Sequence, residues 1–81
     1  MRIDMGTASW GSPEKLDMSL RCVRDMSTSD WRFLVVDNAS EDPRVREVIE
    51  RHMAEEPRIQ AKFLDENIGY VGAVNTILEW A

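Results

Sequence analysis

Several features that would assign a chain to a broad class are missing from this 81-residue sequence. Cys22 is its only cysteine, so no internal disulfide can form, and a reducing, cytoplasmic setting is expected. No run of 18 apolar residues could span a bilayer, and the first residues lack the apolar segment of a signal peptide. Basic residues are few, and the net charge of -5 argues against the nucleic-acid backbone as the main ligand, because that affinity comes from clustered Lys and Arg.

Three familiar site motifs are also absent. Gly6 to Gly11 has the glycine spacing of a phosphate-binding P-loop, but Ser12-Pro13 stands where that loop needs Lys and then Ser or Thr. No GxGxxG fingerprint is present, and a receiver domain would need two acids where this chain has Ser9-Trp10. His52 has no second His or Cys at metal-ligand spacing and is expected on a solvated helix face. The sequence therefore predicts no metal site.

What the sequence does contain is a run of three strand and helix signals. Apolar residues make up 43% and charged residues 31% of the chain, which is typical of one small globular domain. We expect strands at residues 2–9, 31–36 and 58–64, with helices starting near residues 13, 43 and 69. "WRFLVV" (residues 31–36) is apolar enough to be buried on both faces of a parallel sheet.

The helix starts and the buried helix faces follow from caps and periodicity. Ser12 before Pro13 and Asp42 before Pro43 are expected to cap the first two helices through their side chains. The apolar spacing predicts these buried faces: Leu16, Leu20 and Val23 in the first helix, Val45, Val48, Ile49 and Met53 in the second, and Val71, Val74, Ile77 and Leu78 in the third.

The order βαβαβα predicts a three-layer, Rossmann-like α/β fold. Alternating units of this kind form a short parallel sheet with right-handed crossovers, here in the spatial order 3-2-1. Ligands of such sheets bind beyond the carboxyl ends of the strands. The candidate site is therefore formed by the loops at residues 9–12, 37–42 and 65–72.

Asp37 is the most informative residue at these strand ends. In "VVDNAS" (residues 35–40) two strand residues run directly into a carboxylate, an amide and two small residues. A carboxylate in this place can accept hydrogen bonds from a planar base or a ribose hydroxyl, and such partners offset its desolvation. Asn38 to Ser40 are explained equally well as a capped entrance to the second helix. Trp10 is either a packing aromatic or a surface on which a base stacks.

The stretch "DENIGYVGAVN" (residues 65–75) places two glycines in the first turn of the third helix. Gly69 and Gly72 each cost about 1 kcal/mol relative to alanine. Close approach of a ligand or of another backbone would offset that cost, and a helix N-terminus attracts anionic groups such as a diphosphate. Asn67 is either an N-cap or a ligand contact, and Asn75 can bond a loop of the same chain as easily as a ligand.

"FLVVDNASED", followed roughly thirty residues later by "DENIGYVGAVN", resembles the N-terminal half of family 2 glycosyltransferases, inverting enzymes of the A-type nucleotide-sugar fold. "TASWGSPEKL" is similar to the end of their first strand and the start of their first helix. The resemblance implies that Asp37 binds the base of a UDP- or dTDP-type nucleotide-sugar. The other binding residues that it implies are Ser9 and Trp10 beside the base, Asn38, and Asn67, Gly69, Gly72 and Asn75 along the ribose and diphosphate.

The resemblance also implies that some functional parts of the family lie outside residues 1–81. Asn38 stands where the family often has a second acid, as in rhamnosyl- and galactofuranosyl-type members. The chain stops at "ILEWA", before the family's metal-binding Asp-x-Asp, its catalytic base and its acceptor half. We therefore expect a single, truncated nucleotide-binding half-domain without catalytic residues, with Mg²⁺ or Mn²⁺ bound only in the complete enzyme.

Two hypotheses of different class remain open. In the first, the chain is the nucleotide-binding portion of a glycosyltransferase that transfers a sugar from a nucleotide-sugar to an acceptor hydroxyl. In the second, it is a non-catalytic interaction or oligomerisation module that retains the fold. The exposed edge of the first strand motivates the second hypothesis, because such an edge can pair with the missing C-terminal half or with a second copy of the chain.

Overall fold

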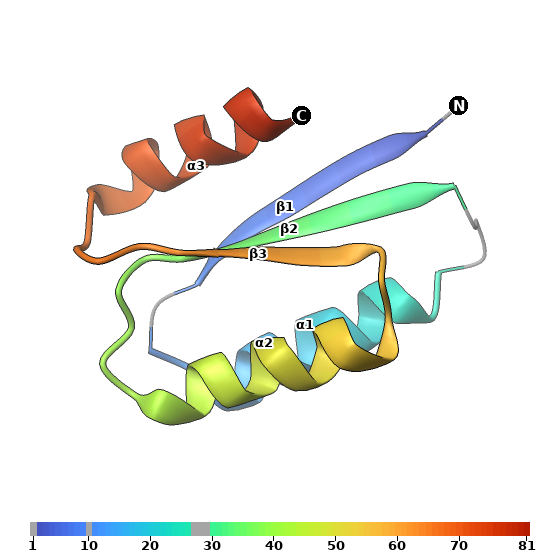
Figure 1. Ribbon diagram of the computed structural model, residues 1–81, viewed down its shortest axis with the longest axis horizontal. Coiled ribbons are helices and arrows are strands. Elements are labelled where there is room, and N and C mark those ends of the chain that lie inside the picture. The colour runs from blue at the N-terminus through green and yellow to red at the C-terminus, as the bar shows by residue number, and fades with distance from the viewer. Residues whose placement is uncertain (1, 10, 27–29) are drawn as a thin grey trace.

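The computed structural model describes residues 2–9, 11–26 and 30–81 and contains six alternating strands and helices (Figure 1). They are β1 (Ile3–Ser9), α1 (Pro13–Arg24), β2 (Trp31–Asp37), α2 (Pro43–Glu55), β3 (Ile59–Phe63) and α3 (Gly69–Trp80). The three strands are parallel and lie in the order β1-β2-β3. Helices α1 and α2 cover one face of the sheet and α3 covers the other, which confirms the expected three-layer fold and strand order.

The central strand β2 supplies both halves of the core. Trp31, Phe33 and Val35 pack with the apolar side chains of α1 and α2, whereas Leu34 and Val36 pack under α3. This alternation is the two-residue period of a strand, and both sets of side chains are buried. The uninterrupted apolar run thus forms a strand that is covered on both faces, as expected.

Strand β1 contains two residues that weaken its sequence signal, and each has a partner. Asp4 lies opposite Arg32 of β2, whose Nε and Nη2 donate to the carboxylate at 2.8 and 3.1 Å. Gly6 lies under α3, and a Cβ at this position would come within 2.5 Å of Cγ2 of Ile77. The charge is therefore neutralised across the sheet, and the missing side chain makes room for the helix.

The two predicted side-chain caps have different outcomes. Asp42 caps α2, because its Oδ1 accepts a hydrogen bond from the backbone N–H of Arg44 at 2.9 Å. Ser12 occupies the N-cap position of α1, but its hydroxyl makes no capping hydrogen bond, so that prediction is wrong. The backbone of Ser12 (φ -131°, ψ 87°) differs from that of Asp42 (φ -78°, ψ 115°), and its side chain is one atom shorter.

The buried face of α3 also differs from the prediction. Ile77 packs against the sheet as predicted, but Val71 and Leu78 are 72% and 66% exposed. Ala73 and Trp80, which were not predicted, complete the contact. Glu79 is the only charged residue of this helix, so its polar residues do not mark one side clearly. The space above Gly6 selects the side that carries Ile77. No helix in the part of the chain that the structure describes is long and apolar enough to cross a membrane.

Candidate functional site

The carboxyl ends of the strands bring two predicted site residues together. Ser9, at the end of β1, lies in register with Asp37, at the end of β2, and both are 7% exposed. Leu64, just beyond β3, donates its backbone N–H to the carbonyl of Asp37 at 2.9 Å. Three chain segments therefore meet around Asp37, at the edge of the sheet where ligands of parallel α/β folds bind.

The carboxylate of Asp37 retains most of its capacity to accept hydrogen bonds. Its Oδ1 accepts from the backbone N–H of Ser40 at 3.2 Å, which is its only hydrogen bond with the described part of the chain. A carboxylate has about four acceptor positions. A buried carboxylate with one protein donor is suited to a ligand that presents further N–H or O–H groups.

Ser40 connects the loops that follow β1 and β2, a role that the sequence analysis missed. Its Oγ accepts from the N–H of Gly11 at 3.0 Å and lies 3.5 Å from the carbonyl oxygen of Ser9, to which it donates. The intervening Ala39 has a φ of 58°, a left-handed conformation that is uncommon for a residue with a side chain. The loop after Asp37 is therefore held in one conformation by hydrogen bonds to the β1 side.

Asn38 joins the same loop to the start of α3. Its side chain accepts from the N–H of Ile68 at 2.9 Å and donates to the carbonyl of Gly69 at 3.2 Å. Asn67 accepts from the N–H of Gly69 at 2.8 Å, but the N-cap position of α3 is occupied by Ile68, so Asn67 is not the N-cap considered for it. Two amide side chains thus bind the backbone where α3 begins.

The presence of glycine at two positions of α3 is explained by the backbone conformation and by contacts within the chain. Gly69 has a φ of 78°, and no other atom lies within 4 Å of where its Cβ would be, so its backbone conformation is what requires glycine. A Cβ on Gly72 would come within 2.9 Å of the side chain of Ile68. Their cost in helix propensity is therefore offset by local geometry before any ligand is considered.

A cavity of about 230 Å³ opens between these elements and is lined by Ala8, Ser9, Asn38, Asn67 and Tyr70. Ligand pockets commonly measure about 300–1,000 Å³, so this space suits part of a nucleotide-sized ligand. The sequence analysis did not single out Ala8 or Tyr70, although an aromatic beside the glycines of "NIGYVG" was a usable signal.

Four predicted site residues of the described part of the chain do not line this cavity: Asp37, Gly69, Gly72 and Asn75. Asn75 is exposed on the second turn of α3. Trp10 lies outside the described residues.

The described residues offer no site for a metal ion, since they contain no group of three or more His, Cys, Asp or Glu side chains that could hold one. Asp37 contributes a single carboxylate at the strand ends.

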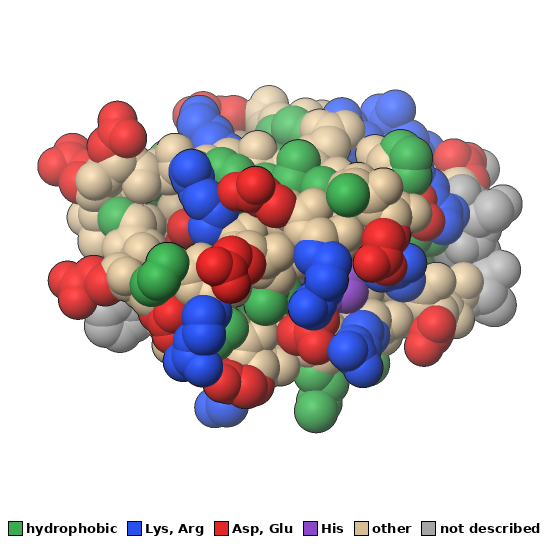
Figure 2. Space-filling model, turned by 60° about the horizontal axis from the view of Figure 1, so that its bottom comes forward, with side chains coloured by type: hydrophobic (Ala, Val, Ile, Leu, Met, Phe, Trp, Pro, Cys, Tyr) green, Lys and Arg blue, Asp and Glu red, His purple; other side chains and the backbone are tan. Residues whose placement is uncertain are grey.

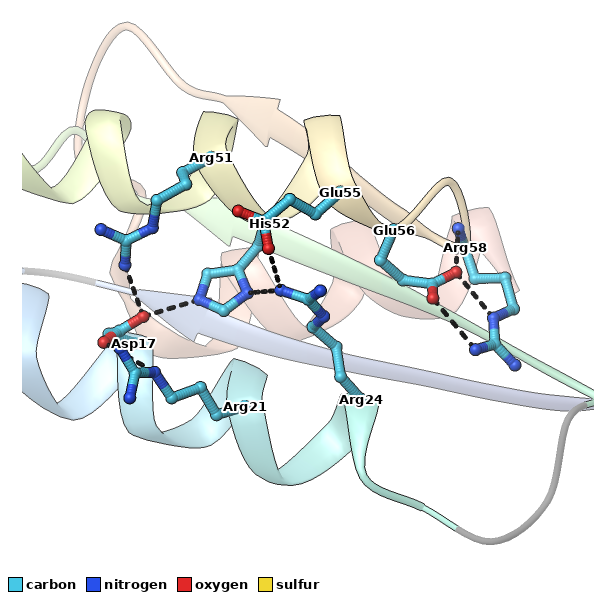
Figure 3. Close-up of polar contacts among 8 residues, drawn as sticks. All are labelled: Asp17, Arg21, Arg24, Arg51, His52, Glu55, Glu56 and Arg58. Atoms are coloured by element: carbon cyan, nitrogen blue, oxygen red, sulfur yellow. Dashed lines mark hydrogen bonds and ion pairs between the residues drawn. The ribbon is translucent and has the colours of Figure 1, made fainter.

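A second polar cluster lies between α1 and α2, away from the strand ends (Figure 3). His52 is 2% exposed rather than solvated as expected, and its Nε2 lies 2.7 Å from Oδ1 of Asp17. Its Nδ1 lies 3.1 Å from Nη1 of Arg24. Because a guanidinium can only donate, Nδ1 must accept, and the proton is on Nε2.

This cluster has a structural role. The His52 hydrogen bond holds the pKa of Asp17 below its usual value, with further help from Arg21 and Arg51. Figure 2 shows acidic and basic side chains interspersed over the face formed by the two helices. His52 and Asp17 thus hydrogen-bond to each other across the contact between the two helices.

The sequence profile described as "Glycosyl transferase family 2" matches residues 8–81, which include every strand end described above. The chain belongs to glycosyl transferase family 2. A protein of *Bacillus subtilis* (strain 168), described as a putative teichuronic acid biosynthesis glycosyltransferase, TuaG, is 29% identical over 75 residues. That alignment covers 93% of this chain and 29% of the relative.

Two further matches also cover most of this chain but only a small part of the other protein. An uncharacterised protein, y4gI, of *Sinorhizobium fredii* (strain NBRC 101917 / NGR234) is 30% identical over 69 residues, which are 85% of this chain and 8% of that protein. The mannosyltransferase PcManGT from Pyrobaculum calidifontis, solved in complex with GDP-Man and Mn²⁺, superimposes with a TM-score of 0.84 at 20% identity. The match covers 99% of this chain and 24% of that structure. The family 2 chain thus spans less than a third of the relatives it matches and shares their fold.

Proposed function

We propose that this chain is the nucleotide-binding portion of an inverting glycosyltransferase that transfers a sugar from a UDP- or dTDP-linked donor to an acceptor hydroxyl. The observation that carries the proposal is Asp37, a buried carboxylate at the end of the central strand with one protein donor. Family membership supports the reaction class. The carboxylate would accept hydrogen bonds from the edge of the base, which replace its lost hydration.

The remaining binding residues are proposed on the β1 side and on the α3 side of the strand ends. Ser9 and Trp10 would flank the base on the β1 side. Asn67, Gly69, Gly72 and Asn75 would border the ribose and diphosphate on the α3 side. The helix dipole of α3 supports this division, because it favours a negatively charged group at the N-terminus of the helix.

The chemical step itself is assigned to parts of the complete enzyme beyond these residues. In an inverting transfer, a base deprotonates the acceptor hydroxyl, which displaces the nucleoside diphosphate directly. A divalent cation would neutralise the leaving diphosphate, and Mg²⁺ or Mn²⁺ is proposed for the complete enzyme. The role proposed for residues 1–81 is to bind and orient the nucleotide-sugar donor.

An amide NMR titration tests the proposal. UDP should shift Asp37, Gly69 and their neighbours, with GDP and ADP as comparisons for the base. Asp37→Asn should weaken UDP binding roughly 10- to 100-fold, since a hydrogen bond to a charged group contributes about 1.5–3 kcal/mol. Asp25→Asn, an exposed position at the end of α1, makes the same charge change and should bind as the wild type does. A folded chain that responds to none of the nucleotides would contradict the proposal.

A non-catalytic interaction module is the second candidate, and one observation favours it. The outer side of α3 exposes Tyr70, Val71 and Leu78 to solvent, beside the unpaired edge of β1. An apolar surface next to an open strand edge can bind another chain. Nucleotide binding that survives Asp37→Asn, together with self-association, would favour this candidate over the first.

A further inference from the structure

The Asn38 side chain connects two elements that are distant in the sequence. Its Oδ1 accepts from Ile68 N–H at 2.9 Å and its Nδ2 donates to the Gly69 carbonyl at 3.2 Å, so one amide satisfies a donor and an acceptor across about thirty residues of chain. Its backbone N–H donates to the carbonyl of Ser9 at 2.9 Å. Asn38 thereby holds the ends of β1 and β2 and the beginning of α3 together.

Both polar atoms of the Asn38 side chain make hydrogen bonds within the protein. Asn38 is 5% exposed, and its oxygen and nitrogen each have a backbone partner. Only an amide of this length presents an acceptor and a donor side by side. A carboxylate of the same shape would keep an acceptor for Ile68 and would turn a second oxygen toward the Gly69 carbonyl, which can only accept.

The contact determines where the first turn of α3 lies relative to Asp37. Ile68 and Gly69 are the residues at which the helix begins, and Gly69 has the positive φ that turns the chain into it. Asn67 and Tyr70, on either side of them, line the cavity that Asn38 also lines. A change at Asn38 would therefore move the diphosphate side of the cavity without altering any group on the base side.

We propose that Asn38 is a positioning residue: its side-chain amide fixes the N-terminus of α3 against the end of β2, so that both sides of the cavity contact one nucleotide. The proposal rests on the nucleotide-binding function proposed above. It assigns to Asn38 a contact with the protein, and it predicts that the donor N–H of the amide, rather than its size or polarity, is what nucleotide binding requires.

The contact is tested first without a ligand, by amide hydrogen exchange. Asn38→Ala should speed exchange at Ile68 N–H about tenfold or more, because its acceptor is gone. Asn67→Ala is the matched control, since its oxygen accepts from Gly69 N–H and not from Ile68. It should speed exchange at Gly69 and leave Ile68 unchanged. Unchanged exchange at Ile68 in Asn38→Ala would overturn the proposal.

The second measurement is the dissociation constant for UDP, with GDP as a second probe. Asn38→Asp, which keeps the shape and loses the donor, and Asn38→Ala should each weaken binding roughly tenfold. Ile49→Val serves as the comparison for general destabilisation, because Ile49 is a fully buried residue of α2 and does not line the cavity. It should retain wild-type affinity while lowering the midpoint of thermal unfolding.

The two proposals fail in different ways. If neither UDP nor GDP binds the folded wild-type chain, the nucleotide-binding function fails and the positioning role fails with it. If the wild type binds and the Asn38 variants bind equally well, only the positioning role is overturned. If Ile49→Val weakens binding as much as Asn38→Asp does, the effect is one of general stability, and the positioning role is again overturned.

Discussion

Gly6 of β1 leaves room for the side chain of Ile77 on α3. Gly6→Ala should destabilise the fold by about 1–3 kcal/mol, because its Cβ would come within 2.5 Å of Cγ2 of Ile77. Ile is branched at Cβ and its χ1 is stiff, so this methyl cannot swing aside as the end of a long side chain would. Urea denaturation measures the difference in the free energy of unfolding.

A double-mutant cycle identifies the cause of that loss. In an Ile77→Ala background the methyl group is gone, so Gly6→Ala should cost only a few tenths of a kcal/mol. Equal costs of Gly6→Ala in both backgrounds would show that the loss comes from the backbone of β1 and not from the contact with α3.

At the scale of single residues, strand ends could be predicted and long-range partners could not. The carboxyl ends of parallel strands meet at one edge of the sheet, so the positions of Ser9 and Asp37 follow from the strand pattern alone. The contacts of Asn38 and of Ser40 join residues about thirty positions apart, and no local pattern shows which loops will touch. His52 is a similar case, since its buried position depends on Asp17 of α1.

At the scale of the elements, the two helix caps give a matched pair of substitutions. Asp42→Ala should destabilise the chain by about 1 kcal/mol, because the hydrogen bond to Arg44 N–H is lost. Ser12→Ala should change stability by less than about 0.5 kcal/mol, since the Ser12 hydroxyl makes no capping hydrogen bond. Thermal unfolding of both variants checks the difference, and a larger loss for Ser12→Ala would contradict this account of the helix starts.

The contact between α1 and α2 should make stability depend on pH through Asp17. The folded state lowers the pKa of Asp17 below its ordinary value of 3.8, with the His52 hydrogen bond as the main cause. A lowered pKa contributes stability that is present above the unfolded value and is lost as the pH falls through the folded one. Asp17→Asn should therefore be less stable than the wild type near neutral pH, and this difference should shrink in acid.

The measurement is the thermal midpoint between about pH 6 and about pH 3. Asp65→Asn, an exposed loop position, makes the same charge change and should follow the wild-type curve. A difference between Asp17→Asn and the wild type that stays constant over this range would show that the contact contributes nothing through ionisation.

The place and the buried face of a helix or strand could be predicted where polar residues clearly distinguish its exposed side from its buried side. Strand β2 is apolar from Phe33 to Val36 and α2 alternates clearly, and both occupy the predicted places. Helix α3 has one charged residue, so its periodicity does not choose between the side with Ile77 and the side with Val71 and Leu78. The choice depends on Gly6, which is more than sixty positions away in the chain.

At the scale of the whole molecule, the open edge of β1 and the outer side of α3 form one surface. Ile3 N–H donates to Asp30 and the Ser9 carbonyl accepts from Asn38, so odd-numbered residues of β1 direct their backbone groups toward β2. By alternation, Asp4, Gly6 and Ala8 direct theirs to the open edge.

The exposed side of α3 lies above this edge. Thr76 and Glu79 lie on the side of α3 toward β3. The periodicity of the helix then places Val71, Val74 and Leu78 on the opposite side, toward the edge of β1. These three side chains carry no charge, so two copies of the surface do not repel each other.

We expect this surface to bind a second copy of the chain. A twofold axis perpendicular to the sheet would pair the two β1 edges as antiparallel strands and bring both α3 helices together on one face. The uncharged surface of α3 then meets itself, and the two edges satisfy each other's backbone groups.

Leu78→Glu tests this arrangement in sedimentation velocity over a concentration series. Burying a leucine contributes about 1.5–3 kcal/mol and the interface contains two copies, so the dimer dissociation constant should rise by more than about a hundredfold. Met18→Glu is the matched control, because Met18 on α1 is 68% exposed and Leu78 is 66% exposed. It should leave the dimer unchanged. A wild-type chain that stays monomeric at high concentration would contradict the predicted pairing and would leave the surface to the remainder of a longer polypeptide.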